Sequence, residues 1–274
     1  MQEFKKYTGE SKITLMDNST VAFLEKIEKS EISTKKLLAD YDAILLPKWV
    51  LKEVNDSIYR KRYIEELIRD GLPIYTISEE KYSKFVYMEE GNLYQIVLAT
   101  VSMLGPLKSY LRRYVEEPDP LDMEEYHEWI LKMYKNWPLS NKDECIKRKN
   151  AGEISLVILA EIFSWYYPAI ELITIYTQDY DCFAYQKNAH KILKNIFKNK
   201  SAVEIGFKSN DFLLSLMYRK KVISASKIKE LRKNERYVTY TRKQKDESTI
   251  LTSSRLDNEK FIELLNDKSA QVIF

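Results

Sequence analysis

Carboxylates that follow apolar, strand-like runs are the residues of this chain best placed to do chemistry. Asp179 and Asp181 come directly after the β-branched and aromatic run at 171–177, and Asp17 ends a shorter run at 13–17. A carboxylate at the end of a buried strand loses hydration, which costs free energy unless a cation or hydrogen bonds compensate it. The carboxyl ends of parallel strands share one edge of a sheet, so we expect Asp17 and Asp179 to be neighbours that bind a metal ion.

Two glutamates in helical segments extend this set of acids. Glu53 follows the apolar run at 42–47, and Glu153 lies in the first turn of an apolar helix. Each acid has an ordinary alternative explanation: Asp17 can cap the next helix, Glu53 can be a surface charge, and Glu153 can complement the helix dipole. Taken together, carboxylates without a His or Cys cluster favour Mg²⁺ or Mn²⁺, which prefer oxygen ligands.

Alternating strands and helices position these acids. Strands are predicted at 13–17, 42–47, 74–77 and 171–177, and helices at 21–30, 48–71, 150–167 and 185–200. This alternation predicts the α/β class, with helices on both faces of a central, mainly parallel sheet. The chain is expected to form a single domain over residues 1–274.

Two parts of the chain depart from this alternation. Residues 82–150 contain helical segments without a clear strand, which predicts a helical insertion. Residues 201–274 are expected to form a C-terminal extension with a helix at 209–224, a β-hairpin within 236–243 and a terminal helix at 256–267.

Composition limits the classes of protein to consider. The chain has 274 residues, with 44 Lys and Arg against 41 Asp and Glu, so its net charge of +3 says little about partners. Two cysteines are too few for a disulfide framework and fit a reducing, cytoplasmic location. The chain has no signal-peptide pattern and no apolar run of the roughly 18 residues that span a bilayer, so no membrane partner is expected. His127 and His190 are expected to be structural or surface residues.

Basic and aromatic residues offer places for a phosphate backbone. One helix face is predicted to carry Lys187, Lys191, Lys194 and Lys198, and the C-terminal extension interleaves Arg236, Tyr237, Tyr240, Arg242 and Lys243. Such residues can contact phosphates and stack on single-stranded bases, although a solvated helix face and a packed hairpin are the ordinary alternatives. The acidic stretch at 116–128 predicts either a solvated surface or a protein-binding surface, and nucleic acid should avoid it.

The order of the acids resembles that of PIN-domain nucleases. The segments ITLMDNSTVAFLEKI, LPKWVLKEV, AGEISLVILAEI and IYTQDYDCF match the family's sequence elements and supply Asp17, Glu53, Glu153 and Asp179. The resemblance covers about residues 11–77 and 148–200. The chain departs from compact members by its helical insertion, by Glu at position 153 where Asp is common, and by Gln at position 178 where Asn is frequent.

The resemblance implies a PIN-like α/β/α sandwich and a metal-dependent endoribonuclease. Asp17 and Asp179 would be direct or bridging ligands of Mg²⁺ or Mn²⁺, with Glu53 and Glu153 completing the shell. Two ions about 4 Å apart would stabilise the attacking and leaving oxygens of a phosphodiester. Asp181 is a further candidate, and the hydroxyl of Thr177 would orient a ligand or the attacking water. The family also suggests RNA as the substrate, a toxin, phage-defence or RNA-processing role, a protein partner such as an antitoxin, and a homodimer.

Two other functions stay open from the sequence. A flap-type or other DNA nuclease of related fold would use the same acids, although no helical-arch or duplex-binding signature is visible. A non-catalytic PIN-like binding or regulatory module would keep the fold and make its contacts through the insertion or the tail. The presence of all four acids disfavours this last reading.

Overall fold

The computed structural model describes residues 1–87, 89–105, 107, 125–142, 145–232, 235–244 and 247–274. A parallel sheet of six strands lies at its centre, in the order β1-β4-β3-β2-β7-β8. The strands are β1 (Gln2–Glu3), β2 (Lys12–Met16), β3 (Ala43–Pro47), β4 (Ile74–Ile77), β7 (Leu172–Tyr176) and β8 (Ile205–Lys208). The central strands β2, β3 and β7 are buried almost throughout, which explains their continuous apolar sequences. The four predicted strands are confirmed.

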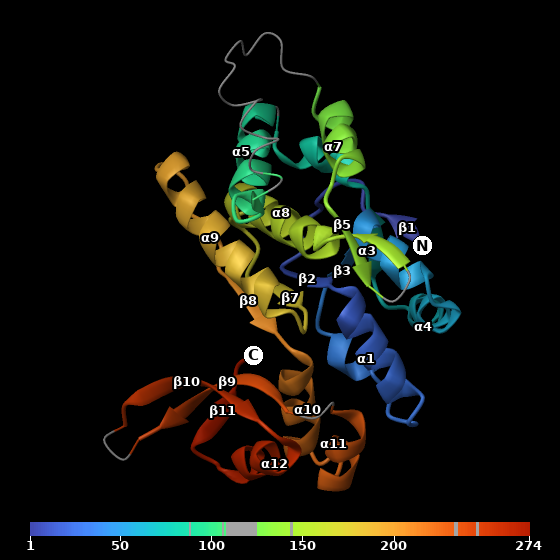
Figure 1. Cartoon of the computed structure of the whole chain (residues 1–274), viewed down its shortest axis with the longest axis vertical. Coiled ribbons are helices and arrows are strands. Elements are labelled where there is room, and N and C mark those ends of the chain that lie inside the picture. Colours follow the sequence, from blue (N-terminus) through green and yellow to red (C-terminus); the bar gives the residue numbers. More distant parts are fainter. Residues whose placement is uncertain (88, 106, 108–124, 143–144, 233–234, 245–246) are drawn as a thin grey trace.

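Helices cover both faces of the sheet, which confirms the predicted α/β/α layers (Figure 1). On one side lie α1 (Asn18–Glu28) and α4 (Ile58–Arg69), and on the other lie α5 (Glu90–Val101), α8 (Ala151–Tyr166) and α9 (Tyr180–Ile196). α3 (Lys48–Asn55) contacts both α1 and α8. Every residue of α8 except Glu153 is buried, because this helix packs against the sheet on one side and against neighbouring helices on the others. The short helix α2 (Lys35–Leu38) lies between α1 and β3 in the chain.

Two sequence predictions in the first half of the chain differ from the structure. The predicted helix 48–71 is two helices, α3 and α4, because Ser57 adopts an extended conformation with φ of −123° between them. The segment 82–150 contains the 3-10 helix η1 (Glu79–Phe85), α5 and α7 (Tyr126–Lys135), but also an antiparallel pair, β5 (Leu139–Lys142) and β6 (Cys145–Arg148). The prediction that this insertion has no strand is therefore wrong. Most of the acidic stretch 116–128 lies outside the described residues.

The C-terminal extension is only partly separate from the sheet. β8 lies within residues 201–274, yet it pairs with β7 and completes the central sheet. After it come α10 (Asn210–Arg219), α11 (Ala225–Leu231) and an antiparallel sheet of order β10-β9-β11, formed by β9 (Arg236–Lys243), β10 (Thr249–Leu256) and β11 (Ala270–Val272). The terminal helix α12 (Asn258–Asn266) packs on this sheet. Residues 236–243 thus form one strand, and the hairpin partner is β10. No helix in the described part of the chain is long and apolar enough to cross a membrane.

Candidate metal site

Asp17 and Asp179 lie where the strand order of the sheet reverses. From β2 the chain moves outward through β3 to β4, whereas from β7 it moves the opposite way to β8. β2 and β7 pair directly, with Met16 opposite Tyr176, so the residues that follow them meet at the same edge. In open parallel sheets ligands bind beyond the carboxyl ends of the strands at such a reversal.

Asp17 is buried and held by two hydroxyls. Its Oδ2 accepts hydrogen bonds from Ser19 Oγ at 2.6 Å and from Thr177 Oγ1 at 3.2 Å. Its side chain makes no capping hydrogen bond, although the residue stands at the N-cap position of α1. The backbone N–H groups of Asn18 and Ser19 nevertheless lower the pKa of this carboxylate, so it also interacts with the first turn of α1.

Thr177 connects the two strand ends. Its hydroxyl donates to Asp17 and accepts the backbone N–H of Asp179 at 2.9 Å. Asp179 in turn caps α9, because its Oδ1 accepts the backbone N–H of Asp181 at 3.1 Å. Asp179 and Asp181 are both exposed, whereas Asp17 is buried. At this edge of the sheet, Asp17 therefore lies below the surface and Asp179 lies at it.

The two glutamates reach the site from neighbouring helices. Glu53 lies on α3 beside Gly152, the second residue of α8, and a Cβ placed at Gly152 would approach Glu53 Oε1 to 3.2 Å. Glycine at this position therefore allows the two helices to approach closely. Glu153 follows immediately on α8, and its backbone oxygen accepts a hydrogen bond from the buried Cys182 of α9 at 3.8 Å.

The pKa of Glu153 responds to the charges of the other three predicted site acids. Burial and the charges of Asp17, Asp179 and Glu53 together raise the pKa of Glu153 to about 8. Burial also raises the pKa of Asp17, while the hydroxyls of Ser19 and Thr177 oppose that rise. These shifts place the four acids near enough for their charges to interact, although the described side chains do not close around one ion.

The donor set fits a hard divalent cation that keeps part of its water shell. The site offers carboxylate and hydroxyl oxygens, the ligands that Mg²⁺ and Mn²⁺ prefer. Among the residues that the structure describes, no three Asp, Glu, His or Cys side chains stand close enough to ligate one ion together. Water would therefore complete the coordination, as is usual for Mg²⁺ bound through one or two carboxylates.

Glu79 is a buried acid near the site that sequence reasoning missed. It follows β4 at the same edge of the sheet, and its Oε1 accepts hydrogen bonds from the backbone N–H of Trp49 at 2.9 Å and from Ser155 Oγ at 2.7 Å. These partners belong to α3 and α8, the helices that carry Glu53 and Glu153. Glu79 therefore fixes both helix starts relative to each other. The sequence feature that points to this role is the position of Glu79 two residues after an apolar strand.

The metal-free protein should lose stability as the pH rises from about 5 to about 8. Burial raises the pKa of Glu79 to about 7 and that of Glu153 to about 8, from an ordinary value of 4.5. In this window the folded state keeps protons that the unfolded state has released, so unfolding becomes easier as the pH increases. Thermal melts in EDTA across this range measure the effect.

Glu79→Gln isolates one contribution, because its amide oxygen can still accept both hydrogen bonds. We expect this variant to be more stable than the wild type at pH 8 by on the order of 1–3 kcal/mol and equally stable near pH 4. A stability difference that does not change between these two pH values would contradict the assignment.

The basic residues predicted to contact nucleic acid fall into two groups. Lys187, Lys191, Lys194 and Lys198 are exposed along α9 and just beyond its end. In the extension, Tyr237, Arg242 and Lys243 are exposed, whereas Tyr240 is 9% exposed and packs inward. Arg236 forms an ion pair with the buried Asp211. Tyr240 and Arg236 thus have structural contacts that the sequence pattern did not reveal.

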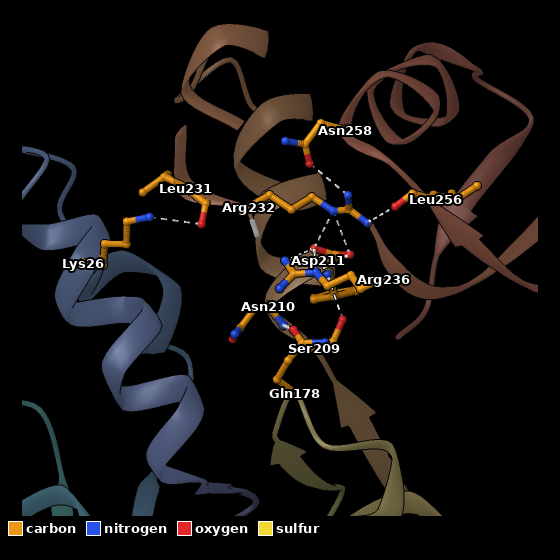
Figure 2. A network of polar contacts seen from close by, with 11 residues as sticks. Lys26, Gln178, Ser209, Asn210, Asp211, Leu231, Arg232, Arg236, Leu256 and Asn258 are labelled. Atoms are coloured by element: carbon orange, nitrogen blue, oxygen red, sulfur yellow. Dashed lines mark hydrogen bonds and ion pairs between the residues drawn. The ribbon is translucent and has the colours of Figure 1, made fainter. Parts of the chain in front are cut away.

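A buried polar network joins the extension to the site (Figure 2). Asp211, at the start of α10, accepts hydrogen bonds from Arg232 and Arg236, and Arg232 also donates to Asn258 and to the backbone oxygen of Leu256. One residue earlier, the backbone N–H of Asn210 donates to Gln178 Oε1 at 3.2 Å.

Gln178 carries this network to the first acid. Its own N–H donates to Ser19 Oγ at 3.3 Å, and that hydroxyl donates to Asp17. Gln178 therefore contacts the start of α10 through its side chain and the Ser19–Asp17 pair through its backbone.

Comparison of the chain with family models, with curated proteins and with solved structures finds no match. What the chain does must therefore be inferred from its own residues.

Proposed function

We propose that the chain is a metal-dependent nuclease of the PIN class that cleaves RNA in the cytoplasm. The observation that supports the proposal is the placement of Asp17 and Asp179 after two neighbouring strands where the strand order reverses, with Glu53 and Glu153 close enough for the charges to act on one another. Repulsion between these acids disfavours the metal-free state, so a divalent cation has a thermodynamic reason to bind.

The site residues have distinct roles in this proposal. Asp17 and Asp179 would hold the cations, and Glu53 and Glu153 would complete the shell directly or through water. Bound divalent ions would neutralise charge on the attacking and leaving oxygens and lower the pKa of a bound water. Thr177 keeps the Asp17 carboxylate oriented through its hydrogen bond to Oδ2. The pKa of Glu153 is raised to about 8, and a cation beside it would favour its ionised form.

The preference for RNA rests on the resemblance to PIN nucleases, and a DNA nuclease would use the same acids. Purified protein should therefore be incubated with labelled single-stranded RNA, single-stranded DNA and their duplexes, with Mn²⁺ or with EDTA. We expect cleavage of RNA with Mn²⁺, none with EDTA, and at least a hundredfold slower cleavage by Asp179→Asn, because an electrostatic contribution of several kcal/mol is lost.

A matched control is Glu66→Gln, which neutralises an exposed glutamate of α4 and should cleave like the wild type. Cleavage that persists in EDTA, or in Asp179→Asn at the wild-type rate, would refute the proposal. Cleavage of DNA alone would keep the metal site and replace the substrate. The absence of any cleavage would favour a non-catalytic binding module.

A further inference from the structure

An exposed aromatic ring lies between two acids of the candidate site. Tyr180 is the first residue of α9, with Asp179 before it and Asp181 after it, and it is 52% exposed. Large aromatic side chains usually bury most of their surface, so a half-exposed ring beside a charged site can serve as a contact for a ligand.

Two aromatic rings contact Tyr180, and a third packs against both of them. Its ring centroid lies 5.8 Å from that of Phe183 on α9 and 6.0 Å from that of Phe274, just after β11. Phe207 of β8 closes the group, with centroids 5.3 Å from Phe183 and 6.4 Å from Phe274. A ring held by such neighbours has little side-chain freedom left to lose when a ligand stacks on it.

Lysines continue along α9 from this ring. Lys187 is seven residues, or about two helical turns, beyond Tyr180, and Lys191 and Lys194 follow at intervals of four and three. The side chains of Tyr180, Lys187, Lys191 and Lys194 are all exposed, and their spacing places them on one face of α9. The row therefore combines an aromatic surface next to the acids with cations that lead away from them.

We infer that Tyr180 is a stacking platform for an unpaired base, so the substrate of the site is a single strand; the inference rests on the proposed nuclease function. Bases within a duplex are already stacked on one another, whereas a single strand can place a base on a protein ring. With one base on Tyr180, an adjacent phosphodiester lies beside Asp179. The rest of the strand can then follow the lysines, whose charges compensate its phosphates.

Binding without cleavage tests this inference separately from the nuclease activity. Fluorescence anisotropy in EDTA at low salt should show that Tyr180→Ala binds a labelled single-stranded oligonucleotide about 5- to 150-fold more weakly than the wild type, the range for one stacked base. Tyr180→Phe keeps the ring and should bind within about twofold of the wild type. Affinity for a duplex of the same sequence should not change in Tyr180→Ala.

Two controls separate stacking from packing. Tyr180→Leu keeps an apolar side chain against Phe183 and Phe274 but has no aromatic face, so it should bind as weakly as Tyr180→Ala. Tyr59→Ala removes a tyrosine of α4 that is 58% exposed and should bind like the wild type.

Equal binding by Tyr180→Ala and the wild type would overturn the inference, as would a wild type that binds no single strand. Full binding by Tyr180→Leu would also overturn it. Failure of the nuclease proposal has a different signature, the absence of Mn²⁺-dependent cleavage while the strand still binds.

Discussion

Asp17→Asn is expected to abolish cleavage and, at the same time, to stabilise the metal-free protein. The Asp17 carboxylate is 5% exposed and contributes to the raised pKa of Glu153. Loss of its charge removes a metal ligand, which should slow cleavage on the order of a thousandfold. The same change relieves repulsion inside the site. We expect a gain in unfolding free energy of about 1–2 kcal/mol at pH 8, the equivalent of roughly one pKa unit.

Thermal melts with EDTA and with Mn²⁺ measure both parts of this expectation. The wild type should melt higher with Mn²⁺, since a ligand at a hundred times its dissociation constant adds about 2.7 kcal/mol. Asp17→Asn should melt above the wild type in EDTA and respond little to Mn²⁺. Glu66→Gln should keep the full response to Mn²⁺. If Asp17→Asn melted below the wild type in EDTA and still responded to Mn²⁺, the acids would not form a metal site.

Asp211→Asn should cause the largest loss of stability, about 3–5 kcal/mol. The Asp211 side chain is 1% exposed and forms ion pairs with Arg232 and Arg236 (Figure 2). The side chain of Arg232 is fully buried. Without the carboxylate, the buried guanidinium of Arg232 and the partly buried one of Arg236 lose the charge that they contact directly. Equilibrium unfolding in urea gives the difference directly.

A surface ion pair at the β9–β10 hairpin is the matched comparison for the buried Asp211 cluster. Glu235 and Arg255 lie 3.3 Å apart, with both side chains more than half exposed. Glu235→Gln should cost less than about 1 kcal/mol, because solvent screens such a pair. Similar losses for Asp211→Asn and Glu235→Gln would show that burial does not set the strength of the Asp211 cluster.

The sequence predicted the structure correctly where a local pattern of residues was sufficient. The strands β2, β3 and β7 are buried on both faces, so their apolar runs are visible in the sequence. Convergence of Asp17 and Asp179 followed from a general property of parallel sheets, that their carboxyl ends share an edge. No contact between distant residues had to be known in advance.

Features that depend on distant contacts were not predictable. β1 has only two residues, and β10 is largely exposed with polar side chains, so neither has a clear apolar pattern. Glu79 looks like a helix-start acid until α3 and α8 pack over it. Arg236 looks like a phosphate contact because its partner, Asp211, is 25 residues away in the chain.

The pairing of β2 with β7 also determines when the candidate site can form during synthesis of the chain. Thr177 and Asp17 are 160 residues apart, so a nascent chain carries the first acid long before the ribosome has added the last. Until then the edge of β2 has no neighbour on that side, and the candidate site is incomplete. If the chain cleaves RNA as proposed, this delay protects the message from which the protein is being translated.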